Sequence, residues 1–205
     1  MTIKPPLIGE ILEEGPWLLG DDEAVIDPRT AALADLFKLS MRRLAAGICA
    51  VTVRHRGEIF GITATSVTSL SLEPPSLLIS VRSTSRLLQV LAKEKAFSVH
   101  VLGEAQAYEA NAFAGRIGPE PRAALVRWVH DADSPPRLAE ATCHIDCRVA
   151  KRVPIFSHVV VVGVVERIEL GPSDRPLVYF DGAFHALETR RNADARDGSG
   201  EGDGG

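Results

Sequence analysis

The sequence predicts a mainly β domain, an antiparallel barrel with a few helices packed on its outside. About seven or more short runs are rich in apolar and β-branched residues, as strands are, whereas only two or three segments have helical spacing. Because these strands do not alternate one-for-one with helices, a mostly antiparallel barrel fits better than a doubly wound parallel sheet. The length of 205 residues suits one domain.

We expect three regions along the chain. Residues 1–28 are rich in proline, glycine and acidic residues, which indicates an N-terminal arm. Residues 29–189 hold the predicted strands and helices and form the domain. Residues 190–205 contain almost no apolar side chain, so this tail cannot bury enough surface to offset its ordering entropy and is predicted to be disordered.

The first half of the domain is predicted to begin with a helix. Asp27-Pro28 has the residue types of a helix start, apolar residues follow at helical spacing, and Gly47 stands where a C-terminal glycine belongs. We therefore expect a helix over about 29–46. His55-Arg56-Gly57-Glu58 is typical of a hairpin turn. Pro74-Pro75 cannot lie within a central strand, and the hydroxyl-rich stretch before it is interpreted as a loop. The strands expected in this half are 48–53, 59–63 and 76–82.

The second half is predicted to contain two short helices and the remaining strands. Ser83-Thr84-Ser85 can cap a short helix, and another helix is expected over 104–114, ending at Gly115. Residues 116–138 are rich in proline and are expected to form a long excursion around one amphipathic piece at 123–129. The strands expected in this half are 96–102, 142–151, 159–168, 177–180 and 183–187.

The composition argues against several classes of function. The formal net charge is -4 and the basic residues are scattered, so nucleic acid is not an expected partner. No stretch reaches the roughly 18 apolar residues of a membrane span, and the N-terminus lacks the continuous apolar region of a signal peptide. The three cysteines suit a reducing compartment better than a disulfide scaffold. We therefore expect a cytoplasmic protein without a membrane partner.

One short segment carries residue types that bind metals. Cys143 and Cys147 flank His144 and Asp146. On a strand, positions 143 and 147 face one side and positions 144 and 146 face the other, so the four side chains cannot converge on one ion. We expect structural cysteines here and no metal site.

Two other segments have the chemistry of a ligand site. Residues 63–71 hold six serines or threonines among nine residues, which suits a polar, planar, phosphorylated ligand or, alternatively, a wide hairpin with solvated hydroxyls. Ser83-Thr84-Ser85-Arg86 combines hydroxyls, a guanidinium and a predicted helix start, which suits a phosphate or, alternatively, plain helix capping. Neither of the standard glycine-rich phosphate loops occurs in the sequence, so a bound nucleotide would have to be held in another way.

Five groups of residues, in chain order, resemble the flavin reductase-like family. These are the FMN-binding split-barrel proteins that include the small reductases of two-component flavin monooxygenases. The resemblance covers about residues 33–187. The segments that carry it are Phe37–Thr52 followed by Gly61–Pro75, Phe97–Leu102, Phe113-Ala114-Gly115, His158 with the run after it, and Pro176–Gly182.

The resemblance implies a flavin, FMN or FAD, as cofactor, and NADH or NADPH as hydride donor. It places the isoalloxazine edge at Thr63 to Ser66, continues the wall with Ser80 and Val81, and gives the phosphate to Ser85 and Arg86. Phe113 is a candidate contact to the ring or ribityl chain, with core packing as the alternative. The cofactor-binding residues assigned in this way are Thr63, Ala64, Thr65, Ser66, Ser80, Val81, Ser85, Arg86 and Phe113.

His158 is the candidate catalytic residue, for binding the hydride donor or handling a proton near the flavin. An imidazole titrates near neutral pH, so it can stabilise a developing anion or orient a nicotinamide. A histidine with a purely structural role at a strand entrance is the alternative. The sequence departs from the family pattern nearby, since Phe156-Ser157 stands where Gly-Asp is usual. Thr65 occupies a position that is often Asn.

The function implied by the resemblance is an NAD(P)H:flavin oxidoreductase that supplies reduced flavin to a monooxygenase. Family members are usually homodimers, so we expect a homodimer and a partner flavin-dependent monooxygenase. Two alternatives stay open at this point. One is a flavin-bound split-barrel enzyme that oxidises or oxygenates an organic substrate itself, and the other is a flavin-binding protein without catalytic activity.

Overall fold

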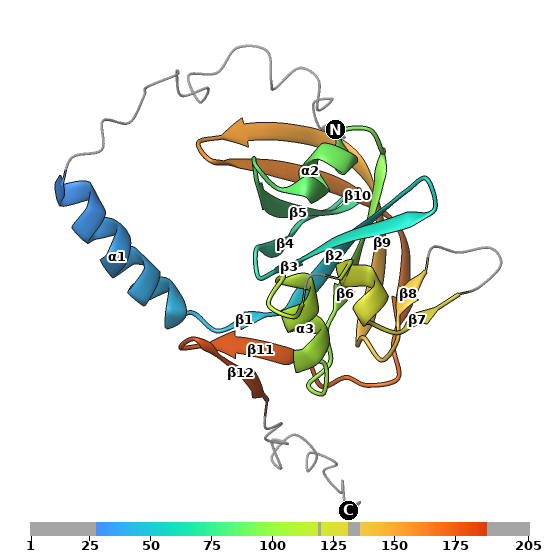
Figure 1. Ribbon diagram of the computed structural model, residues 1–205. Coiled ribbons are helices and arrows are strands. Elements are labelled where there is room, and N and C mark those ends of the chain that lie inside the picture. The colour runs from blue at the N-terminus through green and yellow to red at the C-terminus, as the bar shows by residue number, and fades with distance from the viewer. Residues whose placement is uncertain (1–27, 119, 131–135, 188–205) are drawn as a thin grey trace, which may run out of the picture. The chain divides into compact units, whose positions relative to one another are not determined.

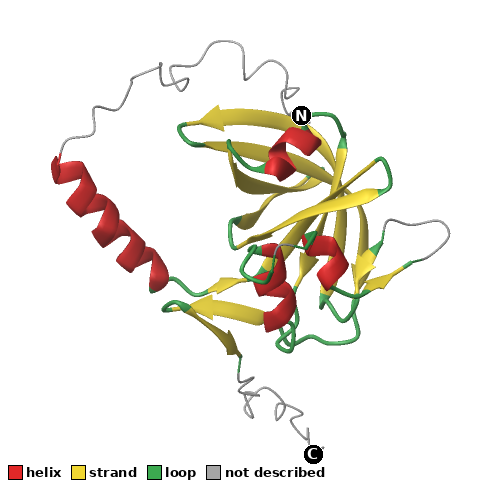
Figure 2. Cartoon of the chain, viewed as in Figure 1, coloured by secondary structure: helices red, strands yellow, loops and turns green. Residues whose placement is uncertain are grey.

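The computed structural model describes residues 28–118, 120–130 and 136–187, and the predictions for the arm before residue 28 and the tail after residue 187 fall outside this range. Its main feature is a seven-stranded sheet in the order β3-β2-β6-β9-β10-β5-β4, in which every pairing is antiparallel (Figure 1). The prediction of a mainly β, antiparallel fold with few helices is confirmed (Figure 2). The strands of this sheet are β2 (Cys49–His55), β3 (Glu58–Ala64), β4 (Val67–Leu72), β5 (Pro75–Arg82), β6 (Ala96–Val101), β9 (Cys143–Ile155) and β10 (His158–Leu170).

Two smaller sheets and the helices complete the described fold. A three-stranded sheet has the order β1-β11-β12, and a two-stranded sheet joins β7 to β8. Their strands are β1 (Ala46–Gly47), β7 (Trp128–Val129), β8 (Arg137–Leu138), β11 (Leu177–Phe180) and β12 (Ala183–Ala186). The helices are α1 (Pro28–Arg42), α2 (Arg86–Leu91), α3 (Ala107–Phe113) and a 3₁₀ turn, η1 (Arg122–Leu125). None of the described helices is long and apolar enough to cross a membrane.

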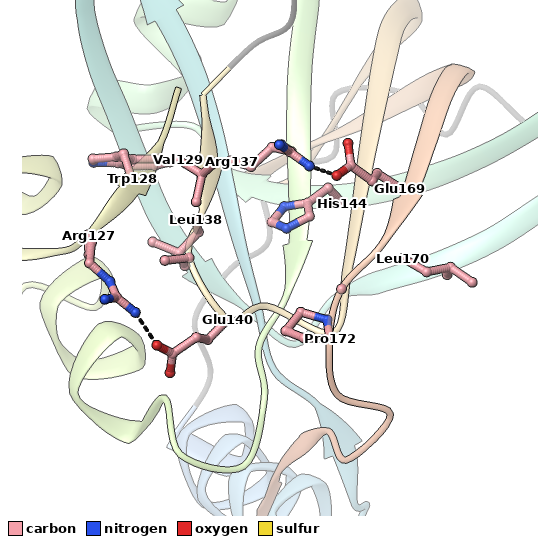
Figure 3. A pocket seen from close by; sticks show the side chains of 12 residues that line it. Arg127, Trp128, Val129, Arg137, Leu138, Glu140, His144, Glu169, Leu170 and Pro172 are labelled. Carbon is pink, nitrogen blue, oxygen red and sulfur yellow. Dashed lines mark hydrogen bonds and ion pairs between the residues drawn. The ribbon is translucent and has the colours of Figure 1, made fainter. Parts of the chain in front are cut away.

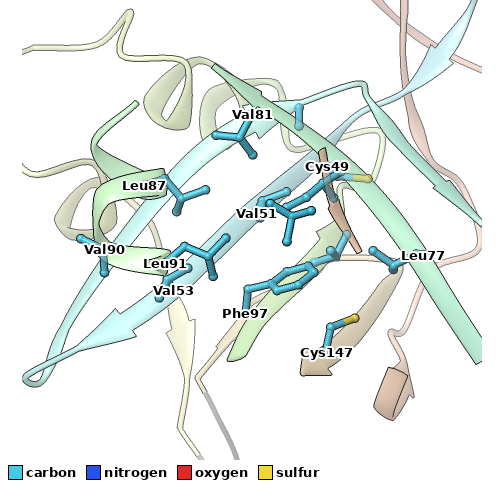
Figure 4. Close-up of a cluster of buried hydrophobic side chains, with 14 residues drawn as sticks. Cys49, Val51, Val53, Leu77, Val81, Leu87, Val90, Leu91, Phe97 and Cys147 are labelled. Carbon is cyan, nitrogen blue, oxygen red and sulfur yellow. The ribbon is translucent and has the colours of Figure 1, made fainter. Parts of the chain in front are cut away.

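The seven-stranded sheet curls around one apolar core. Buried side chains from β2, β5 and β6 meet in a single cluster, and α2 contributes Leu87, Val90 and Leu91 to it (Figure 4). Strands from both halves of the sheet can share one core only if the sheet bends round. The edge strands β3 and β4 pair only with β2 and β5 respectively, so the barrel is left open between them.

A second apolar cluster covers the opposite face of β2. Ile48 and Ala50 pack there with Phe113 of α3 and Leu138 of β8. Residues of β2 alternate between the two clusters, as the two-residue period of a strand requires. Because both faces are covered, nearly the whole of β2 is buried, which explains the continuous apolar run in the sequence.

Three expectations about the elements were wrong. The first helix ends at Arg42, and Gly47 is not a helix cap but lies in β1, where it pairs with Val178. Most of the hydroxyl-rich stretch is not a loop but the edge strand β4, whose polar residues face solvent. The 116–138 excursion contains η1, β7 and β8 instead of one amphipathic piece.

Candidate functional site

Several of the predicted site residues come together at one end of the sheet. His158 opens β10 and is the partner of Arg82, the last residue of β5. On the other side of β5, the Ser66 hydroxyl donates to the Ser80 carbonyl oxygen at 3.0 Å, and the Ser80 N–H donates to the Ser66 carbonyl oxygen at 3.3 Å. Ser66 and Ser80 are thus neighbours, whereas Ser80 is itself opposite Val160, so His158 lies two positions further along β5. Together these residues form a row along this end of β5, with Thr65 exposed beside Ser66.

The segment 83–86 continues directly from this row into α2. Ser85 is the N-cap residue of α2, but its side chain makes no capping hydrogen bond. The guanidinium of Arg86 lies 4.9 Å from the centre of the Phe60 ring, and none of the described carboxylates forms an ion pair with it. A hydroxyl that makes no capping bond and a guanidinium without an ion pair to the described carboxylates are the donors that a phosphate needs. These residues therefore fit the phosphate end of a flavin nucleotide.

The side chains of the remaining predicted residues, Thr63, Ala64, Val81 and Phe113, point into the protein. The Thr63 hydroxyl donates to the Ala110 carbonyl oxygen at 2.5 Å and so faces α3. The side chains of Ala64 and Val81 are buried in the barrel core. Phe113 is fully buried beside Trp128, with ring centroids 6.2 Å apart, which supports the core-packing alternative for this residue. Only the backbone groups of residues 63, 64 and 81 can line a ligand.

The hairpin between β9 and β10 carries His158. Its two-residue turn is Phe156-Ser157, because Ile155 is the partner of His158. Phe156 has a φ of 51°, a left-handed conformation for which glycine is the favoured residue, and its side chain is 83% exposed. The Ser157 hydroxyl lies 3.0 Å from Nδ1 of His158. The two positions that depart from the family pattern thus hold a residue in a strained conformation, Phe156, and a hydroxyl partner for the histidine, Ser157.

Two serines that the sequence analysis did not assign connect this hairpin to the segment 83–86. The N–H and the hydroxyl of Ser83 both donate to the Ser157 carbonyl oxygen, at 2.9 and 3.0 Å. The two residues are 74 positions apart in the sequence. Ser83 belonged to a recognised segment, but no sequence signal pointed to its partner.

The cysteines and the residues around them have a structural environment. As expected for a strand, Cys147 faces the barrel core while His144 and Asp146 face the other side. Burial raises the pKa of both Cys49 and Cys147 to about 12, so these thiols stay protonated. Among the described residues, no group of three or more His, Cys, Asp or Glu side chains is placed to hold a metal ion.

A cavity of about 440 Å³ lies away from this row, beside β7, β8 and the far ends of β9 and β10 (Figure 3). It is separated from His158 by the length of β10, since its lining residues include Glu169 and Leu170. The charged side chains that line it pair with one another, Arg127 with Glu140 and Arg137 with Glu169. This pairing leaves the cavity less suited to a phosphate than the segment 83–86.

Comparison with known proteins identifies a family domain in this chain. Residues 41–188 match the flavin reductase like domain. The reductase component of 4-hydroxyphenylacetate 3-monooxygenase from Thermus thermophilus is 37% identical over 155 residues, which cover 76% of this chain and 97% of that protein. An NADH-dependent FMN reductase from Ancylobacter novellus is 30% identical over 151 residues, covering 74% of this chain and 83% of that protein.

A solved structure is similar along almost its whole length. The NADH:FAD oxidoreductase of Streptomyces globisporus, determined in complex with NAD and FAD fragments, superposes with a TM-score of 0.70 at 27% sequence identity. The similarity covers 83% of this chain and 99% of that one. Since the matched family domain extends over most of the described barrel, the chain belongs to the flavin reductase-like family.

Proposed function

We propose that this protein is an NAD(P)H:flavin oxidoreductase that transfers hydride to FMN or FAD and supplies the reduced flavin to a monooxygenase. One observation carries the proposal: in a chain of this family, Ser66, Ser80, the segment 83–86 and His158 converge at one end of the sheet. The names of the relatives favour NADH as donor and leave FMN and FAD both open.

Each part of the row has a distinct role in binding. Ser85 and Arg86 hold the phosphate, because the Ser85 hydroxyl makes no capping bond and the Arg86 guanidinium contacts a ring face instead of a described carboxylate. Residues 63–66 and the adjoining part of β5 present backbone groups and the Ser66 hydroxyl to the edge of the ring system. When bound, the flavin supplies the hydride-accepting chemistry, and the protein supplies orientation and electrostatics.

His158 takes the nicotinamide side of the site. It lies on the strand next to Ser80, two positions further along, and next to the segment 83–86, so a donor held by its imidazole would be close to a flavin bound along this row. Hydride transfer requires close approach and alignment of the two rings. Orientation of the donor is therefore the main contribution of His158.

An oxidation assay tests the function directly. The purified protein is mixed with FMN or FAD and with NADH or NADPH, and the loss of nicotinamide absorbance is followed. We expect oxidation that depends on added or bound flavin. A protein that oxidises neither donor would refute the reductase. A yellow protein whose colour neither donor changes would instead support a flavin-bound enzyme acting on an organic substrate, or a flavin-binding protein.

The binding assignment has its own test. The double variant S85A/R86A removes two donors to a charged phosphate, and hydrogen bonds to charged groups contribute about 1.5–3 kcal/mol each. We expect flavin affinity to fall by roughly 100-fold or more. The matched control is S173A, in a serine beyond the far end of β10 whose hydroxyl accepts from the nearby Arg175 N–H. Unchanged flavin affinity in the double variant would refute the phosphate assignment.

A second copy of the chain is the proposed partner for exposed apolar surface. Considered by itself, α1 exposes Leu33, Leu36, Phe37 and Met41 at helical spacing, and a helix with an uncovered apolar stripe needs a partner. A homodimer would supply it, and light scattering after size-exclusion chromatography would measure the mass.

The three thiols form no disulfide within the described chain, which supports the proposed cytoplasmic location.

A further inference from the structure

The hairpin that carries His158 is tied to the proposed phosphate segment at one atom, the Ser157 carbonyl oxygen. Ser83 donates to this oxygen twice, from its N–H at 2.9 Å and from its hydroxyl at 3.0 Å. The neighbouring residues Arg82 and His158 are strand partners. The turn of the hairpin and the start of the segment 83–86 are therefore held together by two neighbouring contacts, the pairing of Arg82 with His158 and the two bonds from Ser83 to Ser157.

Ser157 acts on His158 through its side chain as well. Its hydroxyl lies 3.0 Å from Nδ1 of the imidazole. A hydroxyl can donate to Nδ1 or accept from it, so this bond orients the ring in either neutral tautomer. The bond does not use Nε2.

We infer that Ser83 and Ser157 are positioning residues that set the orientation of His158 toward the hydride donor. Ser157 fixes the ring through Nδ1, and Ser83 fixes Ser157 through its carbonyl oxygen. Neither serine needs to touch the flavin or the donor. The inference rests on the proposed function, because that function assigns His158 to the nicotinamide side.

Kinetics of single variants separate positioning from flavin binding. A hydrogen bond between neutral groups contributes about 1 kcal/mol, so S157A is expected to raise the KM for NADH by about five-fold. S83A, which removes one of two donors, should have a smaller effect in the same direction. The dissociation constant of the flavin should stay within about two-fold of the wild-type value. S157T and S83T, which keep a hydroxyl, should restore most of the loss, and S173A should match the wild type.

A measurement on the histidine itself is independent of turnover. In protein with ¹⁵N-labelled histidine, the Nδ1 resonance of His158 should show a hydrogen-bonded nitrogen in the wild type and in S157T, and lose that signature in S157A. An unchanged Nδ1 signal in S157A, or a flavin affinity that falls as much as the NADH KM rises, would overturn the inference. A wild-type protein that oxidises neither donor would refute the proposed function, while the Nδ1 signal would still decide whether Ser157 orients the ring.

Discussion

Replacing His100 by glutamine is expected to flatten the dependence of stability on pH between about pH 7 and pH 5. His100 is buried, with Nε2 2.9 Å from the Thr52 hydroxyl and Nδ1 2.8 Å from Nδ1 of His144. Burial, and then the neighbouring His144, lower the pKa of His100 to about 3. The folded protein therefore keeps this imidazole neutral over the whole range.

The magnitude follows from the protons that each state binds. The unfolded chain protonates a histidine near pH 6.5, so below that pH it binds a proton that the folded state does not. Stability is thus greatest above about pH 6.5 and is lost as the pH falls. For His100 alone, the loss between pH 7 and pH 5 is about 2 kcal/mol. His144, whose pKa is lowered by burial and by Arg137 although Asp146 opposes this, adds in the same direction.

Urea denaturation at the two pH values measures the effect. The H100Q variant removes the titrating ring but keeps a polar side chain, so its stability should fall by about 2 kcal/mol less than that of the wild type. The control is H185Q, because His185 is exposed, with its ring against the Phe180 carbonyl oxygen and edge-on to the Phe180 ring. The reasoning fails if H100Q loses as much stability as the wild type on acidification. Should H100Q not fold, ¹⁵N spectra of the wild type at about pH 5 must still show His100 neutral.

Three further substitutions test the packing around the site. G163A should destabilise by about 2 kcal/mol in urea denaturation, because an added Cβ would lie 2.5 Å from Cζ of Phe97; an unchanged midpoint would mean that the ring moves freely. F156G should be more stable than F156A by about 1 kcal/mol, since Phe156 has a φ of 51°, and thermal unfolding that ranks them in the opposite order would contradict this. R122A removes a 2.8 Å hydrogen bond to the Phe113 carbonyl oxygen and should speed amide exchange in α3 without changing exchange in β10.

The elements that were predicted correctly from the sequence are those that residues within the element itself determine. The runs at 48–53, 76–82 and 96–102 are apolar because the strands that contain them are largely buried. The turn at Arg56-Gly57 was recognised from its residue types, and Gly57 does have a positive φ, of 85°. The short helix after Ser83-Thr84-Ser85 was recognised from its capping residue types, although the Ser85 side chain does not cap it.

The errors arose where a distant partner decides the structure. Gly47 looks like a helix terminus, but its place in β1 depends on Val178, which is far away in the sequence. The stretch at 67–72 looks like a loop because it is polar. It forms a strand because it pairs with β5, and an edge strand can expose polar residues to solvent. The bond between Ser83 and Ser157 was missed for the same reason, since no periodic pattern links positions so far apart.

The openness of the barrel between β3 and β4 explains why the two ends of the proposed site should respond differently to substitution. An edge strand has backbone N–H and C=O groups that no neighbouring strand uses, and β3 pairs only with β2. The Gly61 carbonyl oxygen, for example, accepts from the Arg122 guanidinium. Backbone groups survive most side-chain changes, so the proposed flavin edge should tolerate Thr65 where Asn is usual. The proposed phosphate end depends on the side chains of Ser85 and Arg86, and alanine substitutions should therefore cost far more affinity there than at residues 63–65.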